Sequence, residues 1–398
     1  MRIDRQFPVH AARIAALVAV GCMAAGGAWA QDSFMPYVAY SIAYDDNVFG
    51  LPDDIDYKAL AGRASGSDTV RTAHAGLKMD YRLSRQRFEA SADFSRAAYA
   101  YFKALDHSGR DLQATWHWLA GKDFSGTLGA SEVRALNQLT SIDSLERNLR
   151  RTRRGHGDGA WLLTPSWRLR MGGASFQLDH DLASQRFGNI SEKTWETGVD
   201  YLARSGNSIG IVAGLLNGRY PERRTADGGA ERYRQRDAKF RIDWRYSGKT
   251  RLEMLLGWSA RKARGARVAD FSGPSARIEA TWQPSGKTLV EAGLWREVAA
   301  ADEVLAFYSL NTGASLAPTW LISEKTSLRA ALRYEQRDFE GAPVRISDTS
   351  RSATLTLSHA PSRALRFQLS AFAFDRNSNN RAQQYSRKGA SLQAQYQF

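Results

Sequence analysis

The sequence contains a single cysteine, Cys22, and only 10 prolines in 398 residues. After the N-terminal segment, its longest apolar run, Ile209 to Leu216, falls well short of the roughly 18 residues that a transmembrane helix requires. These absences exclude a disulfide-rich fold and a helical membrane protein. They do not exclude a membrane barrel, because barrel strands alternate between apolar and polar residues and average out as polar.

Motifs for catalysis and metal binding are also missing. The sequence has no GxSxG elbow. The histidines of the mature chain do not show zinc-protease spacing; they are His74, His107, His117, His156, His180 and His359. The acidic segment from Asp45 to Asp56 does not follow EF-hand spacing, so a solvated loop is favoured over a Ca²⁺ site. We expect no enzyme, no cofactor and no metal; a hydrolase whose Ser and His meet only across strands is the alternative.

Residues 1–30 have the pattern of a secretory signal peptide. Arg2, Arg5 and Arg13 precede or flank an apolar stretch from Ile14 to Ala25, and Ala28-Trp29-Ala30 is a small-x-small cleavage site. A lipobox at Cys22 is an alternative that lacks the usual leucine. We predict a signal peptide at 1–30 and one domain at 31–398. The net charge of +14 would suit nucleic-acid binding, but an exported protein seldom meets nucleic acid, so no such partner is expected.

Period-2 alternation runs through nearly the whole mature chain. In Thr72–Leu83 the odd positions are mostly apolar and the even positions mostly polar. Pairs of such strands flank short polar turns and are joined by longer charged connections. The short turns are Ser84–Gln86, Gly121–Asp123, Thr164–Ser166, Ser205–Asn207, Ser247–Lys249, Pro284–Lys287, Ile322–Lys325 and Pro361–Arg363. The pattern predicts an all-β, transmembrane, antiparallel up-and-down β-barrel of about 18 strands, with short periplasmic turns and long extracellular loops, in the bacterial outer membrane.

One face of the predicted strands is suited to lipid and the other to water. Nine tryptophans fall on the apolar face, as the aromatic girdles of a membrane barrel require. They are Trp116, Trp118, Trp161, Trp167, Trp195, Trp244, Trp258, Trp282 and Trp320. A β-sandwich is the alternative, but the opposite face is too charged to form a core. The last strand, Arg387–Phe398, alternates and ends with Tyr396 and Phe398, which resembles the signal that the barrel-assembly machinery recognises.

The polar face carries more cations than acids, so we predict an anion path along the lumen. Rings of Arg select anions, and guanidinium groups bind carboxylates in a bidentate manner. Arg329, Arg333 and Arg337 share one strand and one face. The alternative is that these cations pair with acids across strands. The predicted path consists of Arg82, Arg168, Arg170, Arg241, Arg245, Arg251, Arg277, Arg329, Arg333, Arg337 and Arg366.

A second set of cations is assigned to the long loops, where it would meet lipopolysaccharide phosphates or capture an anionic polymer. Arg96 and Arg296 fall on the apolar face and would reach phosphates near the outer rim. The longest loop, Asp45–Asp68, is a candidate constriction. The loop cations are Arg147, Arg151, Arg153, Arg223, Arg224, Arg232, Arg234, Arg236, Arg261, Lys262, Arg264 and Arg267.

The segment after the first predicted strand (Met35–Tyr44) reads Tyr44-Asp45-Asp46-Asn47-Val48-Phe49, followed by Leu51-Pro52. It resembles the EpsL-type outer-membrane β-barrel proteins of exopolysaccharide biosynthesis clusters. The resemblance implies a role in exopolysaccharide export, with the polysaccharide and periplasmic export components as partners besides outer-membrane lipid and lipopolysaccharide. It lends no catalytic residues.

These observations leave three hypotheses for function. The first is a barrel that passes an acidic polysaccharide through an Arg-rich lumen. The second is a general or nutrient-uptake porin, and the third is a plugged structural or adhesive barrel. Fold alone does not separate them.

Overall fold

The computed structural model describes residues 34–398 except 138–145, 226–227, 265–269, 301–305, 307 and 341–345. The predicted signal peptide and Arg267 therefore lie outside the described residues. In the described chain, 18 strands form one antiparallel sheet in sequence order, and pairing of β1 with β18 closes it. The predicted all-β barrel of about 18 strands is confirmed.

The strands are β1 (Phe34–Asp45), β2 (Asp68–Leu83), β3 (Gln86–Tyr99), β4 (His107–Ala120), β5 (Phe124–Leu136), β6 (Leu149–Thr164), β7 (Trp167–His180), β8 (Ile190–Leu202), β9 (Ser208–Arg224), β10 (Ala230–Ser247), β11 (Thr250–Arg264), β12 (Phe271–Ser285), β13 (Thr288–Ala300), β14 (Tyr308–Ser323), β15 (Thr326–Glu340), β16 (Ile346–His359), β17 (Leu365–Ser378) and β18 (Tyr385–Gln397). Helical segments are α1 (Tyr57–Ala61), η1 (Lys103–Leu105), η2 (Ala183–Gly188) and η3 (Arg381–Gln383). None of these helices is long and apolar enough to cross a membrane.

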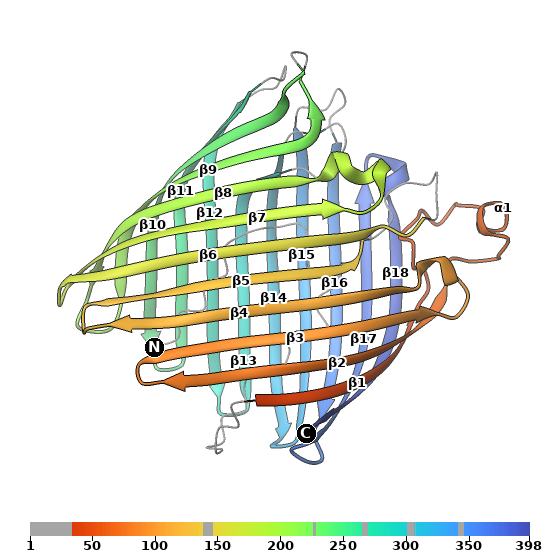
Figure 1. Ribbon diagram of the computed structural model, residues 1–398, viewed down its shortest axis with the longest axis horizontal. Coiled ribbons are helices and arrows are strands. Elements are labelled where there is room, and N and C mark those ends of the chain that lie inside the picture. The colour runs from red at the N-terminus through yellow and green to blue at the C-terminus, as the bar shows by residue number, and fades with distance from the viewer. Residues whose placement is uncertain are drawn as a thin grey trace.

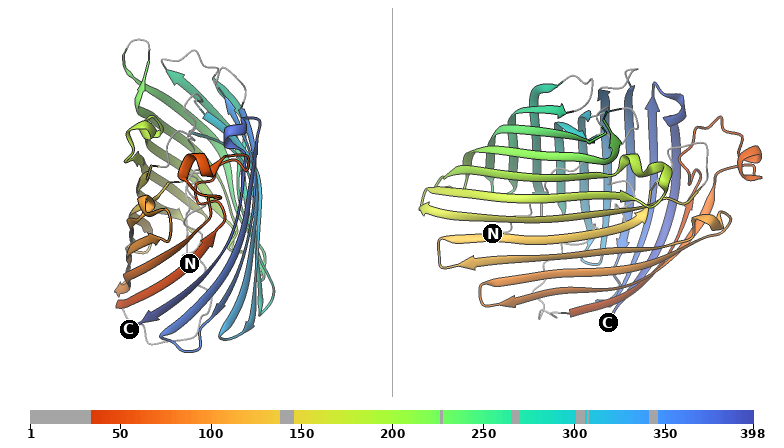
Figure 2. Two further views of the ribbon diagram at one scale, coloured as in Figure 1. Left: turned by 90° about the vertical axis from the view of Figure 1, so that its right-hand side faces the viewer. Right: turned by 45° about the horizontal axis from the view of Figure 1, so that its top comes forward.

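The barrel is flattened, so that two broad walls face each other. In Figure 1 the wall formed by β2 to β9 lies in front, and β12 to β18 run behind it in a crossing direction. The edge-on view in Figure 2 shows how narrow the space between the walls is. Side chains that point inward from opposite walls can therefore come close to each other.

All eight short turns lie at one end of the barrel, which we call the turn end. The β2–β3 turn contains only Ser84 and Arg85, and Ser84 has a positive φ of 55°. The other end, the loop end, carries the long connections and α1. Strands reach 18 residues in β10, longer than the about 10 residues that cross an apolar band. The assignment of Arg151, Arg153 and Arg232 to loops is therefore wrong, because the wall continues beyond the band.

The same correction applies to the other cations that the structure places in strands: Arg223, Arg224, Arg234, Arg236, Arg261, Lys262 and Arg264.

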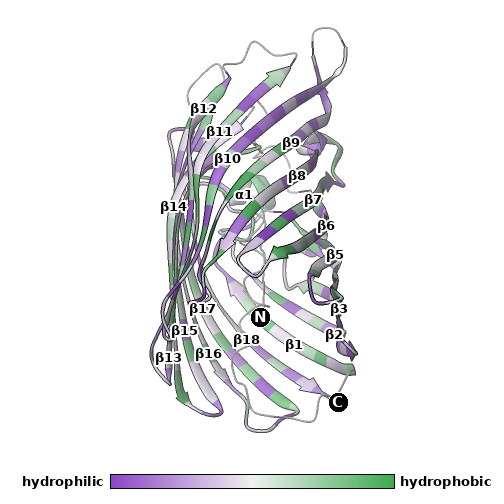
Figure 3. Ribbon diagram, turned by 90° about the vertical axis from the view of Figure 1, so that its left-hand side faces the viewer, coloured by the Kyte–Doolittle hydropathy of each residue, from purple (hydrophilic) through white to green (hydrophobic). Residues whose placement is uncertain are grey.

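Hydropathy alternates along the strands, as Figure 3 shows by colour. The outward residues form an apolar band in which large side chains are exposed, because lipid rather than protein covers them. Representative members are Val38, Tyr40, Leu77, Phe94, Trp116, Leu128, Trp161, Met171, Trp195, Ile211, Phe240, Trp258, Leu294, Leu316, Trp320, Leu332, Leu355, Leu369 and Leu392. The protein is thus an outer-membrane barrel, as its sequence predicts.

Buried apolar residues gather at the loop end rather than in one central core. One cluster joins Phe49 and Leu51 of the first long connection to Ala97, Tyr99 and Leu105. A second joins residues of β7 to β10, namely Phe176, Leu178, Ile190, Tyr220 and Tyr233. The loop end is consequently the packed half of the molecule.

Candidate functional site

The candidate site is the lumen, and the structure places every arginine of the predicted path on inward-facing strand positions. The register shows this directly: Arg241 and Arg245 alternate with outward Phe240 and Trp244, and Arg329 alternates with outward Leu328. What the alternation did not reveal is which carboxylate each guanidinium meets.

The three arginines of β15 are each paired. Arg329 Nη1 lies 2.7 Å from Glu291 Oε2, and Arg333 Nη2 lies 2.5 Å from Glu335 Oε2. Arg337 Nη2 lies 3.1 Å from Asp348 Oδ2. They form a ladder, as predicted, but a ladder of ion pairs rather than of free cations.

Two carboxylates are each held by two arginines inside the lumen wall. Asp200 is 1% exposed, and its Oδ2 accepts hydrogen bonds from Arg168 Nη2 at 2.7 Å and Arg170 Nη1 at 3.2 Å. Asp348, also buried, accepts from Arg337 and Arg376.

Further pairs cross the lumen surface. Arg241 contacts Glu196 at 3.5 Å, Arg251 contacts Asp243 at 2.7 Å, and Arg277 binds Glu297. The inward acids also include four that the sequence analysis did not assign to the lumen, which are Asp158, Glu192, Asp237 and Asp348. The surplus of lumen cations is consequently smaller than the alternation alone suggested.

Three arginines of the predicted path differ from the rest. Arg82, Arg245 and Arg366 lie at the turn end of β2, β10 and β17. Only β18 and β1 separate β17 from β2, whereas β10 lies farther around the barrel. Among the residues the structure describes, none of the three has a carboxylate within ion-pair distance. They are the predicted path residues that remain available to a passing anion.

In the loop half, inward aromatic rings are buried and stacked under arginines. Arg333 Cζ lies 4.0 Å from the Trp295 ring centre, and Trp295 Nε1 donates to Glu335 Oε2 at 3.0 Å. Arg261 Cζ lies 4.5 Å from the Tyr233 ring centre. Other members of this aromatic layer are Tyr99, Phe176, Tyr220, Phe339, Phe374 and Tyr385. Sequence alternation puts these rings on the inward face, but they are buried by arginines, by rings of neighbouring strands and by the first long connection.

Arg223 connects distant parts of the mouth. Its Nη1 donates to the carbonyl oxygen of Ala306 at 2.6 Å, and its Nε donates to that of Phe187 at 3.0 Å. Arg223 belongs to β9, whereas Ala306 lies between β13 and β14. Ala300, at the end of β13, also packs against the cluster on β7 to β10. The two walls therefore meet across part of the loop end.

The segment that carries the family resemblance joins the first strand to the last. Arg387 binds the Asp45 carboxylate, and the backbone N–H of Lys388 donates to Asp46 Oδ1 at 2.7 Å. Asn47 Nδ2 donates to the carbonyl oxygens of Leu51 at 2.7 Å and Ser386 at 3.0 Å. We call Asp45, Asp46 and Asn47 the closure latch, because they seal the β1–β18 seam at the loop end.

The rest of that segment folds over the latch. Phe49 is 1% exposed and packs edge-on against Phe102, with 4.6 Å between ring centres. Tyr57, in α1, donates its hydroxyl to Asn47 Oδ1 at 2.8 Å. Burial, with the nearby carboxylates of Asp53, Asp45 and Asp46, raises the pKa of Tyr57 to about 12. The tyrosine is therefore a permanent donor at neutral pH.

This first connection covers one edge of the mouth. Phe49 and Leu51 lie over the inward residues Ala97 and Tyr99 of β3, while α1 extends away from the strands (Figure 1). Two further residues of the motif differ in position. The Tyr44 ring faces outward and is exposed, whereas Val48 is half-buried and packs against the cluster that contains Phe49 and Leu51.

The predicted assembly residues lie at the turn end of the closed seam. Phe398 donates its backbone N–H to the carbonyl oxygen of Pro36 at 3.0 Å, and its ring packs edge-on against Tyr396. Both rings face outward and are exposed. Their recognition by assembly machinery stays a prediction.

Within the described ranges, no three His, Cys, Asp or Glu side chains are grouped to hold a metal ion. The alternation did not assign Asp348 to the lumen, and Arg223 was expected in a loop, whereas the structure places it near the end of β9. Extending the alternation of β16 back to Ile346 would have put Asp348 on the inward face. Nothing in the sequence indicates the contact from Arg223 to Ala306.

Residues 232–398, which correspond to β10 through β18, match the family model described as "Putative beta-barrel porin 2". No curated protein matches the chain. Among solved structures, the chain is similar to OccAB3 of Acinetobacter baumannii, at 10% identity with 92% of this chain and 99% of that chain covered, and a TM-score of 0.44.

It is also similar to the outer membrane protein opdK of Pseudomonas aeruginosa, at 11% identity with 92% and 98% covered and a TM-score of 0.46. A BenF-like porin of Pseudomonas fluorescens Pf-5 has 10% identity, 92% and 99% coverage and a TM-score of 0.46. The closed sheet and its lipid-facing wall are those of an outer-membrane barrel, and the segment from β10 to β18 is similar to the porin family model.

Proposed function

We propose that the protein is a diffusion channel of the uptake-porin type, which passes small hydrophilic solutes and prefers anions. The observation that carries this proposal is the contrast between the two halves of the lumen. In the turn half, inward ion pairs remain wet: Glu291 is 47% and Glu279 49% exposed at the side chain. A closed barrel of 16 to 18 strands leaves an aqueous channel unless something fills it.

The loop half limits what can pass. The aromatic layer is buried, and Arg223 ties β9 to Ala306 across part of the mouth. A polymer would need a continuous wide path, whereas a small solute needs only a constriction lined by polar groups. This geometry supports small solutes over a polysaccharide.

Charge selectivity is assigned to Arg82, Arg245 and Arg366. Paired arginines present less net charge to a solute, because the carboxylates that contact them, some of which are shared by two arginines, offset part of their charge. The three turn-end arginines have no such partner among the described residues. Cations without a carboxylate partner at a mouth raise the local anion concentration and lower that of cations.

Polysaccharide export is the second candidate, since the segment Tyr44–Phe49 resembles the EpsL-type proteins. The closure latch weakens this argument. Asp45, Asp46 and Asn47 all bond to β18 or to their own loop, so a structural need for barrel closure is enough to explain the motif.

The test is single-channel recording in planar bilayers, with the folded state checked by heat-modifiable migration on gels. We expect stepwise conductance and a reversal potential that shows anion preference in a salt gradient. A folded barrel without conductance would contradict the proposal and favour a plugged barrel. Loss of polymer from the medium of a deletion strain, restored by the wild-type gene, would instead favour export.

A further inference from the structure

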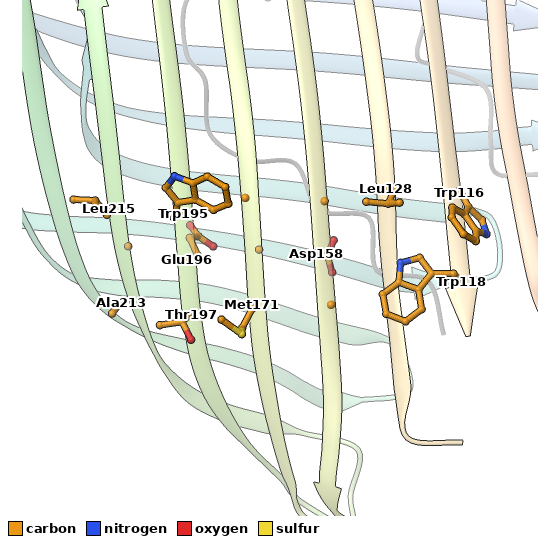
Figure 4. Close-up of a pocket in the computed structure, with 15 residues that line it drawn as sticks. Trp116, Trp118, Leu128, Asp158, Met171, Trp195, Glu196, Thr197, Ala213 and Leu215 are labelled. Atoms are coloured by element: carbon orange, nitrogen blue, oxygen red, sulfur yellow. The ribbon is translucent and has the colours of Figure 1, made fainter. Parts of the chain in front are cut away.

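The outer surface of the barrel carries an apolar groove on β4 to β9. It has a volume of about 770 Å³ and is lined on its two sides by Trp116, Trp118 and Leu128, and by Trp195 and Leu215. Figure 4 shows these side chains with Met171 between them. They occupy outward positions of their strands, so the groove faces the membrane and not the lumen.

Glycines form the floor of this groove. A Cβ at Gly173 would come within 2.8 Å of Trp195, and one at Gly157 within 2.8 Å of Leu128. The wall is therefore thin where the large side chains flank it. A Cβ at Gly159 would meet only Trp118, at 3.7 Å, so that position could carry a larger side chain that fills the groove.

A cluster of cations lies on the same outward surface, next to the groove on its loop-end side. We call Lys193, Arg219, Arg232, Arg234 and Arg236 the basic cluster; all five are exposed. Among the described residues, no acidic side chain faces outward on β8, on β9 up to Arg219, or on β10.

Register places the basic cluster against the groove. Lys193 is the next outward residue after Trp195 on β8, and Arg236 is directly opposite Leu215. Arg219 is directly opposite Arg232, an arrangement of like charges that destabilises a sheet unless an anion compensates it. Arg234 Nε donates to Asn217 Oδ1 at 3.0 Å, which leaves its charge uncompensated.

The neighbouring strands extend the positive surface. The outward Glu132 of β5 accepts hydrogen bonds from Arg151 at 3.0 Å and Arg153 at 3.1 Å, and Arg110 also binds it. Three arginines therefore share one carboxylate. This group lies on β4 to β6, and β7 separates it from the strands of the basic cluster.

The depth of the cluster in the membrane follows from β10. The outward residues from Ala238 to Tyr246 are apolar or aromatic and cover about 26 Å of strand at about 3.3 Å per residue. At a tilt of about 40° this spans about 20 Å, close to the apolar band of a membrane barrel. Arg236 therefore lies at the outer edge of the hydrocarbon, where lipid head groups begin.

We propose that the groove and the basic cluster together form a binding site for the phosphorylated, multiply acylated glycolipid of the outer leaflet. The acyl chains would fill the groove beside Trp195. The phosphates would lie among Lys193, Arg219 and Arg236, since guanidinium and ammonium groups at the hydrocarbon edge bind lipid phosphates. The site requires both an apolar and an anionic part in one ligand.

Charge argues against the other occupants. A second copy of this chain docking through the same face would bring its own basic cluster against this one, and like charges would repel. A soluble anionic polymer would satisfy the cations but leave the groove and its tryptophans unfilled.

The experiment measures lipid binding by native mass spectrometry of the refolded barrel in detergent. The probes are bis-phosphorylated lipid A, the same lipid without phosphates, and phosphatidylglycerol. The test variant is Lys193→Gln/Arg219→Gln/Arg236→Gln. Its matched control, Arg296→Gln/Arg351→Gln/Lys388→Gln, removes two arginines and one lysine from outward loop-half positions on other strands.

We expect the apparent Kd for bis-phosphorylated lipid A to rise at least tenfold in the test variant and less than threefold in the control. Gly159→Leu should weaken the binding of both forms of lipid A, because the new side chain fills the acyl groove. This variant provides a test that does not depend on folding of the triple variant. Equal losses in test and control, or equal binding of the dephosphorylated lipid, would overturn the proposal. So would binding of phosphatidylglycerol as tight as that of lipid A, or a stable dimer that binds no lipid.

Discussion

Asn47 donates its side-chain amide to the carbonyl oxygen of Ser386 at 3.0 Å, which joins the end of the first strand to the beginning of the last. The same amide group bonds to Leu51 and accepts from Tyr57. One buried side chain thus holds the seam and the loop that covers it.

Replacing Asn47 with Ala should destabilise the barrel by about 1–3 kcal/mol, because buried partners lose their hydrogen bonds. Urea unfolding in detergent, followed by tryptophan fluorescence, measures the change. Asp54→Ala is the matched control on the same loop, since Asp54 is exposed, and it should change stability by less than about 0.5 kcal/mol. Equal effects of the two substitutions would show that the latch has no special role.

The hydrogen bond from Tyr57 should make the loop sensitive to strongly alkaline pH only. The folded-state pKa of Tyr57 is raised from 10.0 to about 12, so its contribution is fully present below pH 10 and is lost as the pH rises through 12. Difference absorbance titration of wild type against Tyr57→Phe should resolve one tyrosine that ionises near pH 12. If the tyrosine that the variant lacks instead ionises near pH 10, the contact is contradicted.

Asp200 should matter far more for stability than Glu291, although both pair with arginine. Asp200→Asn leaves Arg168 and Arg170 without a compensating charge in a buried site, which should cost about 3–5 kcal/mol. Glu291→Gln breaks an exposed pair with Arg329 and should cost about 0–1 kcal/mol. The two variants are compared by urea unfolding under identical conditions, and similar losses would refute the distinction.

Anion preference should depend on the turn-end arginines more than on the β15 ladder. Arg82→Gln/Arg245→Gln/Arg366→Gln should shift the reversal potential toward cations, because these charges have no partner among the described residues. Arg329→Gln/Arg333→Gln/Arg337→Gln removes the same charge but also frees carboxylates, and should lower the fraction of folded protein. Selectivity that changes only with the ladder would instead support the path first drawn from the sequence.

The alternation of residue types determined the strands, the turns and the two faces of the wall. Arg329, Arg333 and Arg337 could be assigned to the lumen from sequence because a strand turns every second side chain to the same face. The outward positions of Arg96 and Arg296 followed in the same way. Such assignments need only local backbone geometry.

Partnerships were decided by the tertiary structure, because they depend on which strands meet and in which register. The sequence placed Arg151, Arg153 and Arg232 in loops; the wall in fact extends past the apolar band and turns them toward the membrane. The bond from Arg223 to Ala306 joins segments that are far apart in the sequence. Trp295 is covered by Arg333 and bonded to Glu335, which strand pairing brings near it. The excess of positive charge is a property of the sequence, but its place, largely on the outer wall and less in the lumen, was set by the closing of the sheet.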